Sequence, residues 1–218
     1  MAFEKKDGCP FCRLKRELED SERELIMGAS MMEPDIRVKT NSLGFCAKHY
    51  KKLFEMNNRL SLALMLESHL KEISSQTLIY KDSLIGKDNS KKACEAMEKI
   101  TRSCYICERT NEKFEKMLLC AVILWQTAQE FRELCASQPY FCLEHAAAFV
   151  NTAKLKLDKK QFARFAESVS AVQKQYLESL HDDVEWFCKK FDYRYDDEPW
   201  GNSKDSVERA IKLLSGDY

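Results

Sequence analysis

The sequence has few glycines and prolines and no excess of either charge. Its 218 residues include six glycines and four prolines, beside 44% hydrophobic and 32% charged residues. This balance is typical of a helix-rich globular protein and excludes an extensively disordered chain. No stretch has the alternation of apolar and polar residues that marks a β-strand, so we expect an all-α fold.

No segment is apolar for long enough to cross a bilayer. The longest apolar run, Met117 to Trp125, is about half the roughly 20 residues that a transmembrane helix needs. Residues 1–8 lack the apolar core of a signal peptide. We therefore expect a cytoplasmic protein that does not bind membranes.

Positive and negative side chains balance, with 35 lysines and arginines against 35 aspartates and glutamates. The chain therefore has no net field that would hold a polyanion, and nucleic acid is not the favoured partner. A partner protein or a small ligand is the expectation that remains.

Cysteine, by contrast, is abundant, and six of the ten cysteines lie with two histidines in four short motifs. The motifs are Cys9–Cys12 and Cys104–Cys107, which are C-x2-C, and Cys46–His49 and Cys142–His145, which are F-C-x2-H. In a reducing cytosol such spacings are better explained by metal binding than by disulfides. The chain thus contains one pair of motifs twice, at nearly the same spacing.

Three thiolates and one imidazole form an ordinary ligand set for structural zinc. We predict two zinc ions per chain, with ligands Cys9, Cys12, Cys46, His49, Cys104, Cys107, Cys142 and His145. The segments between the motifs are long enough for the C-x2-C and the F-C-x2-H of one repeat to bind the same ion, and we expect each site to close in this way. The alternative, a site shared between the two repeats, stays open. Iron or an iron–sulfur cluster is the alternative, although the spacing matches no common ferredoxin pattern.

Apolar residues recur at spacings of three, four and seven along most of the chain. They predict helices at about 12–32, 46–74, 91–102, 107–126, 128–136, 143–156, 159–190 and 204–215. We expect residues 33–44 to form a loop that leads the chain back to Cys46, and residues 75–90 to form a linker. Thr127–Glu130 is expected to form the capping box of a new helix. The expected architecture is two pseudo-repeated helical hairpins (1–80 and 81–158), each stapled by a Cys3His zinc knuckle, and a C-terminal helical extension (159–218).

The aromatic and acidic loop Phe191–Gly201 is a candidate for a ligand pocket, to which the loop facing the first knuckle could contribute. The candidate residues are Arg37, Asn41, His69, Asp192, Tyr193, Arg194, Tyr195 and Trp200. The alternatives are that the loop pins the last helix to the bundle and that His69 is a hydrogen-bonded helix residue. Outside the motifs, Cys120 and Cys188 lie among apolar residues, and we expect both in the core.

Several of these motifs in combination resemble one family. They are C-P-F-C at 9–12, G-F-C-x2-H-Y at 44–50 with the N-R-L-x-L-A-L helix after it, F-R-x-L before the second F-C-x2-H, and F-D-Y-R-Y with P-W-G-N-S-K-D near the end. They are similar to those of an uncharacterised family of small bacterial proteins, found mainly in anaerobic Gram-positive species and catalogued as a domain of unknown function. The resemblance covers essentially the whole chain and implies a cytosolic bacterial protein, without an activity. One departure is Tyr140, where the first repeat has Gly44.

We expect a binding protein whose zinc ions are structural staples and whose partner protein or small ligand binds between its halves. Four protein ligands leave no open coordination position for catalysis, and the motifs include no catalytic signature. A metalloenzyme or a thiol-based redox or metal-sensing protein is the alternative. A nucleic-acid binder with zinc knuckles is a more distant one, and a homo-oligomer is compatible with the sequence.

Overall fold

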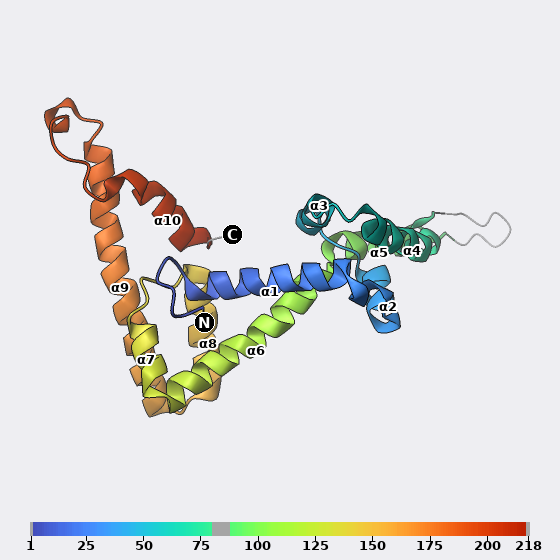
Figure 1. The fold of residues 1–218 in the computed structure, drawn as a ribbon, viewed down its shortest axis with the longest axis horizontal. Coiled ribbons are helices and arrows are strands. Elements are labelled where there is room, and N and C mark those ends of the chain that lie inside the picture. The colour runs from blue at the N-terminus through green and yellow to red at the C-terminus, as the bar shows by residue number, and fades with distance from the viewer. Residues whose placement is uncertain (1, 80–87, 217–218) are drawn as a thin grey trace. The chain divides into compact units, whose positions relative to one another are not determined.

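The computed structural model describes residues 2–79 and 88–216 (Figure 1). Within these ranges the chain forms ten α-helices, three short 3-10 helices and no β-strand. The predicted all-α fold is therefore confirmed, although the sequence predicts eight helices. The α-helices are α1 (Pro10–Met27), α2 (Pro34–Leu43), α3 (Ala47–Glu55), α4 (Arg59–Thr77), α5 (Ser90–Arg102), α6 (Tyr105–Thr127), α7 (Gln129–Ala136), α8 (Leu143–Lys156), α9 (Lys159–Lys189) and α10 (Ser206–Ser215). None of these described helices combines the length and hydrophobicity of a membrane span.

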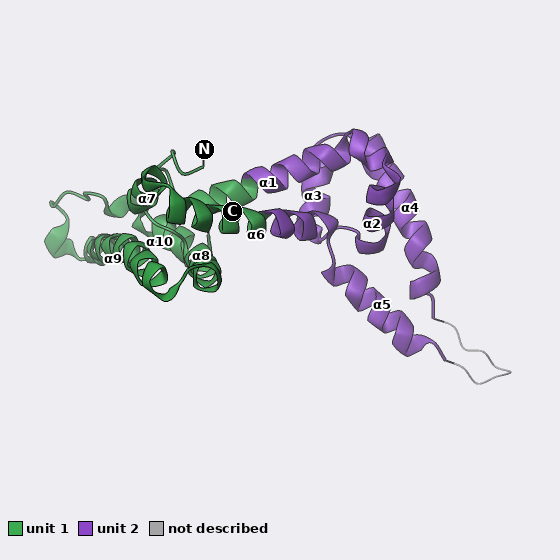
Figure 2. Ribbon diagram, turned by 90° about the horizontal axis from the view of Figure 1, so that it is seen from below, with its two compact units in different colours: residues 1–16, 114–218 green, residues 17–113 purple. Residues whose placement is uncertain are grey.

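The chain folds into two compact units (Figure 2). Unit 1 combines residues 1–16 with residues 114–218, and unit 2 consists of residues 17–113. The chain passes from unit 1 to unit 2 within α1 and returns within α6. These units are defined by packing, and the division of the sequence at residues 80 and 158 stays a prediction.

Unit 1 has an aromatic core. Phe11, at the start of α1, is fully buried, and its ring centroid lies 4.8 Å from that of Phe149 on α8. Phe149 in turn meets Phe165 of α9 edge to face, with 4.7 Å between the ring centroids. Because α7, α8 and α10 all pack on α9 (Figure 1), this long helix organises the unit. Edge-to-face ring pairs of this kind add to the stabilisation from burial alone.

Unit 2 has a mainly aliphatic core of its own, to which α1, α3, α4 and α6 contribute. Its buried members include Ile26, Met27, Phe45, Leu53, Leu62, Met65, Tyr105 and Ile106. Helix α4 packs against both α2 and α5. Each unit therefore buries apolar side chains independently of the other.

The loop predicted at 33–44 is wrong, because residues 34–43 form α2. Pro34 begins this helix at its first turn, where the missing N–H of proline removes a donor that would be unpaired in any case. The preceding helix ends earlier than predicted, at Met27, and a 3-10 turn at 29–32 leads to α2.

The helix predicted at 46–74 is also wrong as one element, since α3 and α4 are separated at residues 56–58. Asn57 has a left-handed backbone with a φ of +59°, which ends the helical path. The Asn58 side chain then accepts a hydrogen bond from Ser61 N and caps α4.

The predicted turn near Gln126 is confirmed, because α6 ends at Thr127 and α7 begins at Gln129. The predicted capping box is wrong, since the Thr127 hydroxyl donates to Ile123 O and Ala128 occupies the N-cap of α7. Most of the predicted linker, residues 80–87, lies outside the described residues.

Gly44 joins α2 to the Phe45–Cys46 motif in a backbone conformation that other residues rarely adopt. Its φ is +57°, and its carbonyl oxygen accepts a hydrogen bond from Tyr105 N at 3.0 Å. The His69 ring lies against this turn because its Nδ1–H donates to Asn41 O at 2.7 Å. A β-carbon at position 44 would lie only 2.7 Å from His69 Nε2, so the turn needs glycine.

We expect Gly44→Ala to lower the free energy of unfolding by roughly 2–6 kcal/mol, since backbone strain and steric overlap each cost about 1–3 kcal/mol. Chemical denaturation followed by circular dichroism measures the change. Gly201→Ala is the matched control, because Gly201 has a φ of +55° but no atom within 4 Å of an added β-carbon. Equal costs for the two variants would show that the His69 contact does not constrain residue 44.

Candidate metal centres

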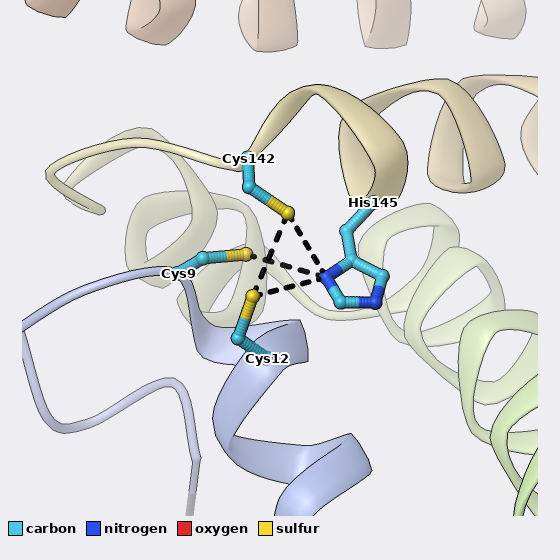
Figure 3. Close-up of side chains that lie close together, drawn as sticks. All are labelled: Cys9, Cys12, Cys142 and His145. Carbon is cyan, nitrogen blue, oxygen red and sulfur yellow. Dashed lines mark hydrogen bonds between the residues drawn. The ribbon is translucent and has the colours of Figure 1, made fainter. Parts of the chain in front are cut away.

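The structure brings the eight predicted ligands together in two clusters of four. Cluster 1 lies in unit 1 and consists of Cys9, Cys12, Cys142 and His145 (Figure 3). Cluster 2 lies in unit 2 and consists of Cys46, His49, Cys104 and Cys107. In each cluster the ligand atoms all lie within 4.8 Å of one another.

The expected closure of each site within its own repeat is wrong, because each cluster combines the C-x2-C of one repeat with the F-C-x2-H of the other. Helix α1 is about 27 Å long, and a return to its start must cover that distance. Ten extended residues could span roughly 35 Å, but residues 34–43 form a helix that spans only about 15 Å. The chain therefore does not bring Cys46 back to the start of α1. Likewise, α7 rises about 12 Å, too little to lead the chain back along the roughly 35 Å of α6.

Every ligand pair sits at the start of a helix. The first cysteine of each pair directly precedes the first helical residue of α1, α3, α6 or α8, and the second ligand is the third helical residue. These two positions face the same side of a helix start, as in a capping box. The partial positive charge of a helix N-terminus also favours thiolates. Two helix starts therefore converge on each cluster.

Zinc bonded to sulfur at about 2.3 Å and to nitrogen at about 2.0 Å in a tetrahedron separates two sulfurs by about 3.8 Å and sulfur from nitrogen by about 3.5 Å. In cluster 1 the Sγ atoms of Cys12 and Cys142 are 3.5 Å apart. His145 Nδ1 lies 3.8, 3.3 and 3.1 Å from the sulfurs of Cys9, Cys12 and Cys142, respectively. The four side chains point toward one common centre (Figure 3), so they fit a tetrahedral ion.

Cluster 2 has the same dimensions. The Sγ atoms of Cys46 and Cys107 are 3.9 Å apart. His49 Nδ1 lies 3.2, 3.2 and 3.4 Å from the sulfurs of Cys46, Cys104 and Cys107, respectively. The Cys107 backbone N–H also points at Cys104 Sγ from 3.5 Å, which supports negative charge on that sulfur. The residues of this cluster therefore fit zinc as well.

Cluster 1 is sealed from solvent. Cys9 and Cys12 are 2% exposed, and Cys142 and His145 are fully buried. The neighbouring thiols, together with burial, hold the pKa of Cys9 far above its ordinary value, and the contact with Cys12 raises the pKa of Cys142 to about 11. Three buried thiols ionise together only when a cation compensates their charge, so this cluster suits a permanently bound ion.

Cluster 2 is more open, since Cys46 and Cys107 are half-buried. Within it, hydrogen bonds from Cys107 and His49 lower the pKa of Cys104 to about 3, although burial opposes the shift. The same helix-start geometry therefore holds two clusters with different access to solvent.

Glu19 lies behind His49, and the sequence offers no motif that would have identified it. Its Oε1 is 3.2 Å from His49 Nε2, a contact of ion-pair length. Burial alone would raise the pKa of Glu19, but hydrogen bonds from Lys52 and Lys48 lower it to about 2. An ionised carboxylate behind a histidine favours the tautomer that leaves Nδ1 for the metal. In cluster 1 the corresponding carboxylate, Glu144, is exposed and 4.0 Å from His145 Nε2.

The other candidate site residues fall into two groups. Asn41 and His69 meet in unit 2 through the hydrogen bond described above, and Arg37 lies one turn before Asn41 on α2. The aromatic loop belongs to unit 1, where Asp192 and Arg194 pair with each other and Tyr193 is 83% exposed. His69 is thus the hydrogen-bonded helix residue of the alternative interpretation.

Lys190 stabilises the aromatic loop (Phe191–Gly201) by hydrogen bonds to the carbonyl groups of the loop. Its side chain is buried, and its Nζ donates to the carbonyl oxygens of Glu198, Asp196 and Tyr195, the first two at 2.8 and 3.0 Å. Nζ also lies 5.4 Å from the ring centroid of Trp200. The ammonium group therefore satisfies the loop carbonyls internally.

The expectation that Cys120 and Cys188 are core residues is wrong, because both are exposed on the outer faces of α6 and α9. Cys94 is exposed as well, whereas Cys135 is buried and burial raises its pKa to about 12. Around Cys120 only part of the apolar run is buried: Leu118, Ala121 and Val122 face the core, whereas Leu119 is exposed like Cys120.

Paired substitutions test the crosswise clusters. We expect Cys9→Ser with Cys142→Ser to remove about one zinc per chain, because both residues belong to cluster 1. Cys9→Ser with Cys46→Ser should remove about two, because these residues belong to different clusters. Elemental analysis of the purified variants measures the loss, and Cys94→Ser with Cys135→Ser is the control. The opposite pattern would restore closure within each repeat.

Glu19→Gln should weaken zinc binding at cluster 2 by about 10–100-fold, because the neutral amide no longer stabilises the metal-binding form of His49. Competition with a chromogenic chelator measures the affinity. Glu144→Gln is the matched control at cluster 1, where the carboxylate is exposed. A similar loss in both variants would assign the effect to general electrostatics instead of the contact with His49.

Comparison with known proteins gives a family and no individual relative. No curated protein and no solved structure matches the chain. A family model described as "Family of unknown function (DUF6062)" matches residues 1–218. Since this match covers the whole chain, the protein belongs to the DUF6062 family.

Proposed function

We propose that the protein binds two structural zinc ions, one in each Cys3His cluster, and that it is a cytosolic binding protein. The observation that carries this proposal is the convergence of three sulfurs and one imidazole nitrogen, at tetrahedral spacing, in each of the two units. Soft thiolates and an imidazole favour zinc over the harder divalent cations. None of the ten cysteines forms a disulfide, which is compatible with a reducing compartment.

Each ion would join chain segments that are far apart in sequence. In unit 1 it ties residues 9–12 to 142–145, and in unit 2 it ties 46–49 to 104–107. Treated as crosslinks, closures of this length remove enough entropy from the unfolded chain to contribute about 4–5 kcal/mol each. Zinc would therefore stabilise the two units in which the binding surfaces lie.

Binding is favoured over catalysis because four protein ligands fill the coordination of zinc. A surface suited to binding lies in unit 1, where α8 and α9 form a shallow, open groove of about 580 Å³. Its lining includes the exposed Leu143 and Leu177 beside Val150 and Val169, with Lys174 and Glu178 at the rim. An apolar groove with a balanced rim suits a protein segment or a small apolar ligand more than nucleic acid.

Metal substitution separates a structural from a catalytic site. Purified protein should contain about two zinc ions per chain, and cobalt-loaded protein should have the visible spectrum of tetrahedral thiolate coordination. Added cyanide or azide should leave that spectrum unchanged, because no coordination position is open. A spectral change would favour a metalloenzyme, colour before cobalt loading would indicate iron, and protein without metal would refute the proposal.

A further inference from the structure

We propose that cluster 2 is also a peroxide-reactive thiol pair, in which oxidation joins Cys46 to Cys107 and releases the bound ion. This inference rests on the zinc binding proposed above. Cluster 2 would react with peroxide, whereas cluster 1, which has the same ligand types, is buried and would not.

The difference between the clusters begins with access. The three cysteines of cluster 1 are at most 2% exposed, and the rings of Phe11 and Phe114 cover His145. In cluster 2 two of the three cysteines, Cys46 and Cys107, are half-buried, and only Cys104 is buried. Because oxidation of a thiolate requires contact with the oxidant, peroxide reaches cluster 2 first.

The two accessible sulfurs are also neighbours. Cys46 Sγ and Cys107 Sγ are 3.9 Å apart and come from different segments, the start of α3 and the first turn of α6. A disulfide between them would join the same two segments that the metal joins. The backbone hydrogen bond from Tyr105 N to Gly44 O, at 3.0 Å, and the Ser103 hydroxyl that donates to Leu43 O hold these segments together independently of the ion. Unit 2 would therefore keep its fold when the ion leaves.

The chemistry is balanced with a peroxide as oxidant. The first thiolate attacks one peroxide oxygen, the O–O bond breaks, and a sulfenic acid and hydroxide form. The second thiolate attacks the sulfenic sulfur, the S–S bond forms, and the S–O bond breaks to release a second hydroxide. Two protons convert both hydroxides to water, and the two sulfurs supply the two electrons that reduce the peroxide. Two of the four ligands are then lost, and the ion dissociates.

The remaining exposed cysteines do not provide a comparable pair. Cys94 lies on α5 in unit 2, and Cys120 and Cys188 lie on α6 and α9 in unit 1. Cys104 is buried, so a bond between Cys104 and Cys107 would require the least accessible sulfur of the cluster. The geometry thus favours the Cys46–Cys107 bond.

The test uses the zinc-loaded full chain and hydrogen peroxide. Release of zinc, followed with a chromogenic chelator, should reach about one of the two ions, at a rate on the order of tenfold or more above release of the second. Peptide mapping by mass spectrometry should find Cys46 bonded to Cys107, and circular dichroism should change little. Dithiothreitol with zinc should then restore the original metal content.

Two variants serve as controls. In the triple variant Cys94→Ser, Cys120→Ser and Cys188→Ser, release should be unchanged, because these thiols lie outside the clusters. Cys107→His retains four zinc ligands but cannot form this disulfide, and the remaining thiol partner of Cys46 is the buried Cys104, so its zinc should be released more slowly in peroxide. If this variant fails to fold, the disulfide map of the unmodified chain still decides the matter.

Equal release of both ions, a first disulfide at Cys12–Cys142 or Cys104–Cys107, or oxidation that leaves both ions bound would each overturn the inference. A chain that contains two zinc ions but releases neither in peroxide refutes only this inference. A chain that binds no zinc refutes the proposed function itself, so the two failures are distinguishable.

Discussion

Each unit depends on the meeting of two helix N-termini at three thiols and one imidazole. In unit 1 the starts of α1 and α8 meet, and in unit 2 the starts of α3 and α6 meet. The residues inside or next to these motifs are also core residues: Phe11 and Phe141 in unit 1, and Phe45 and Ile106 in unit 2, are buried. The metal ligands and the apolar core are therefore placed by the same turns, so a change in one disturbs the other.

The local parts of this arrangement could be predicted from the sequence, and the pairing could not. Ligand identity follows from the C-x2-C and C-x2-H spacings, and most helices follow from apolar periodicity. Which C-x2-C motif meets which F-C-x2-H motif depends on the conformation of residues 34–43. As an extended chain they could span the length of α1, whereas as the helix α2 they cannot, and Pro34 is compatible with both conformations. One misassigned segment of ten residues reverses which helix starts can meet.

The different solvent access of the two clusters could not be predicted from the sequence either. It depends on side chains outside the four motifs that only the folded chain brings next to the ligands. Rings of Phe11 and Phe114 enclose His145, whereas Glu19 and its lysine partners lie beside His49. Glu19 precedes His49 by 30 positions and is reached only through the packing of α1 beside α3. Identical motifs can therefore hold one sealed ion and one accessible ion in the same chain.

Four protein ligands in each cluster would fill the coordination of a tetrahedral ion, which moves the search for function from the ions to the surfaces that they would stabilise. The aromatic loop is a weaker candidate than its composition indicates, because Lys190 already satisfies carbonyl groups of Tyr195, Asp196 and Glu198. Polar groups that are satisfied within a loop gain little from a ligand. The groove between α8 and α9, unlike the aromatic loop, has apolar surface that is not covered: Leu143 and Leu177 are 44% and 46% exposed. A partner that buried this surface would gain free energy from the hydrophobic effect. Since Cys142 is the N-cap of α8 and His145 lies in its first turn, an ion in cluster 1 would fix one wall of that groove.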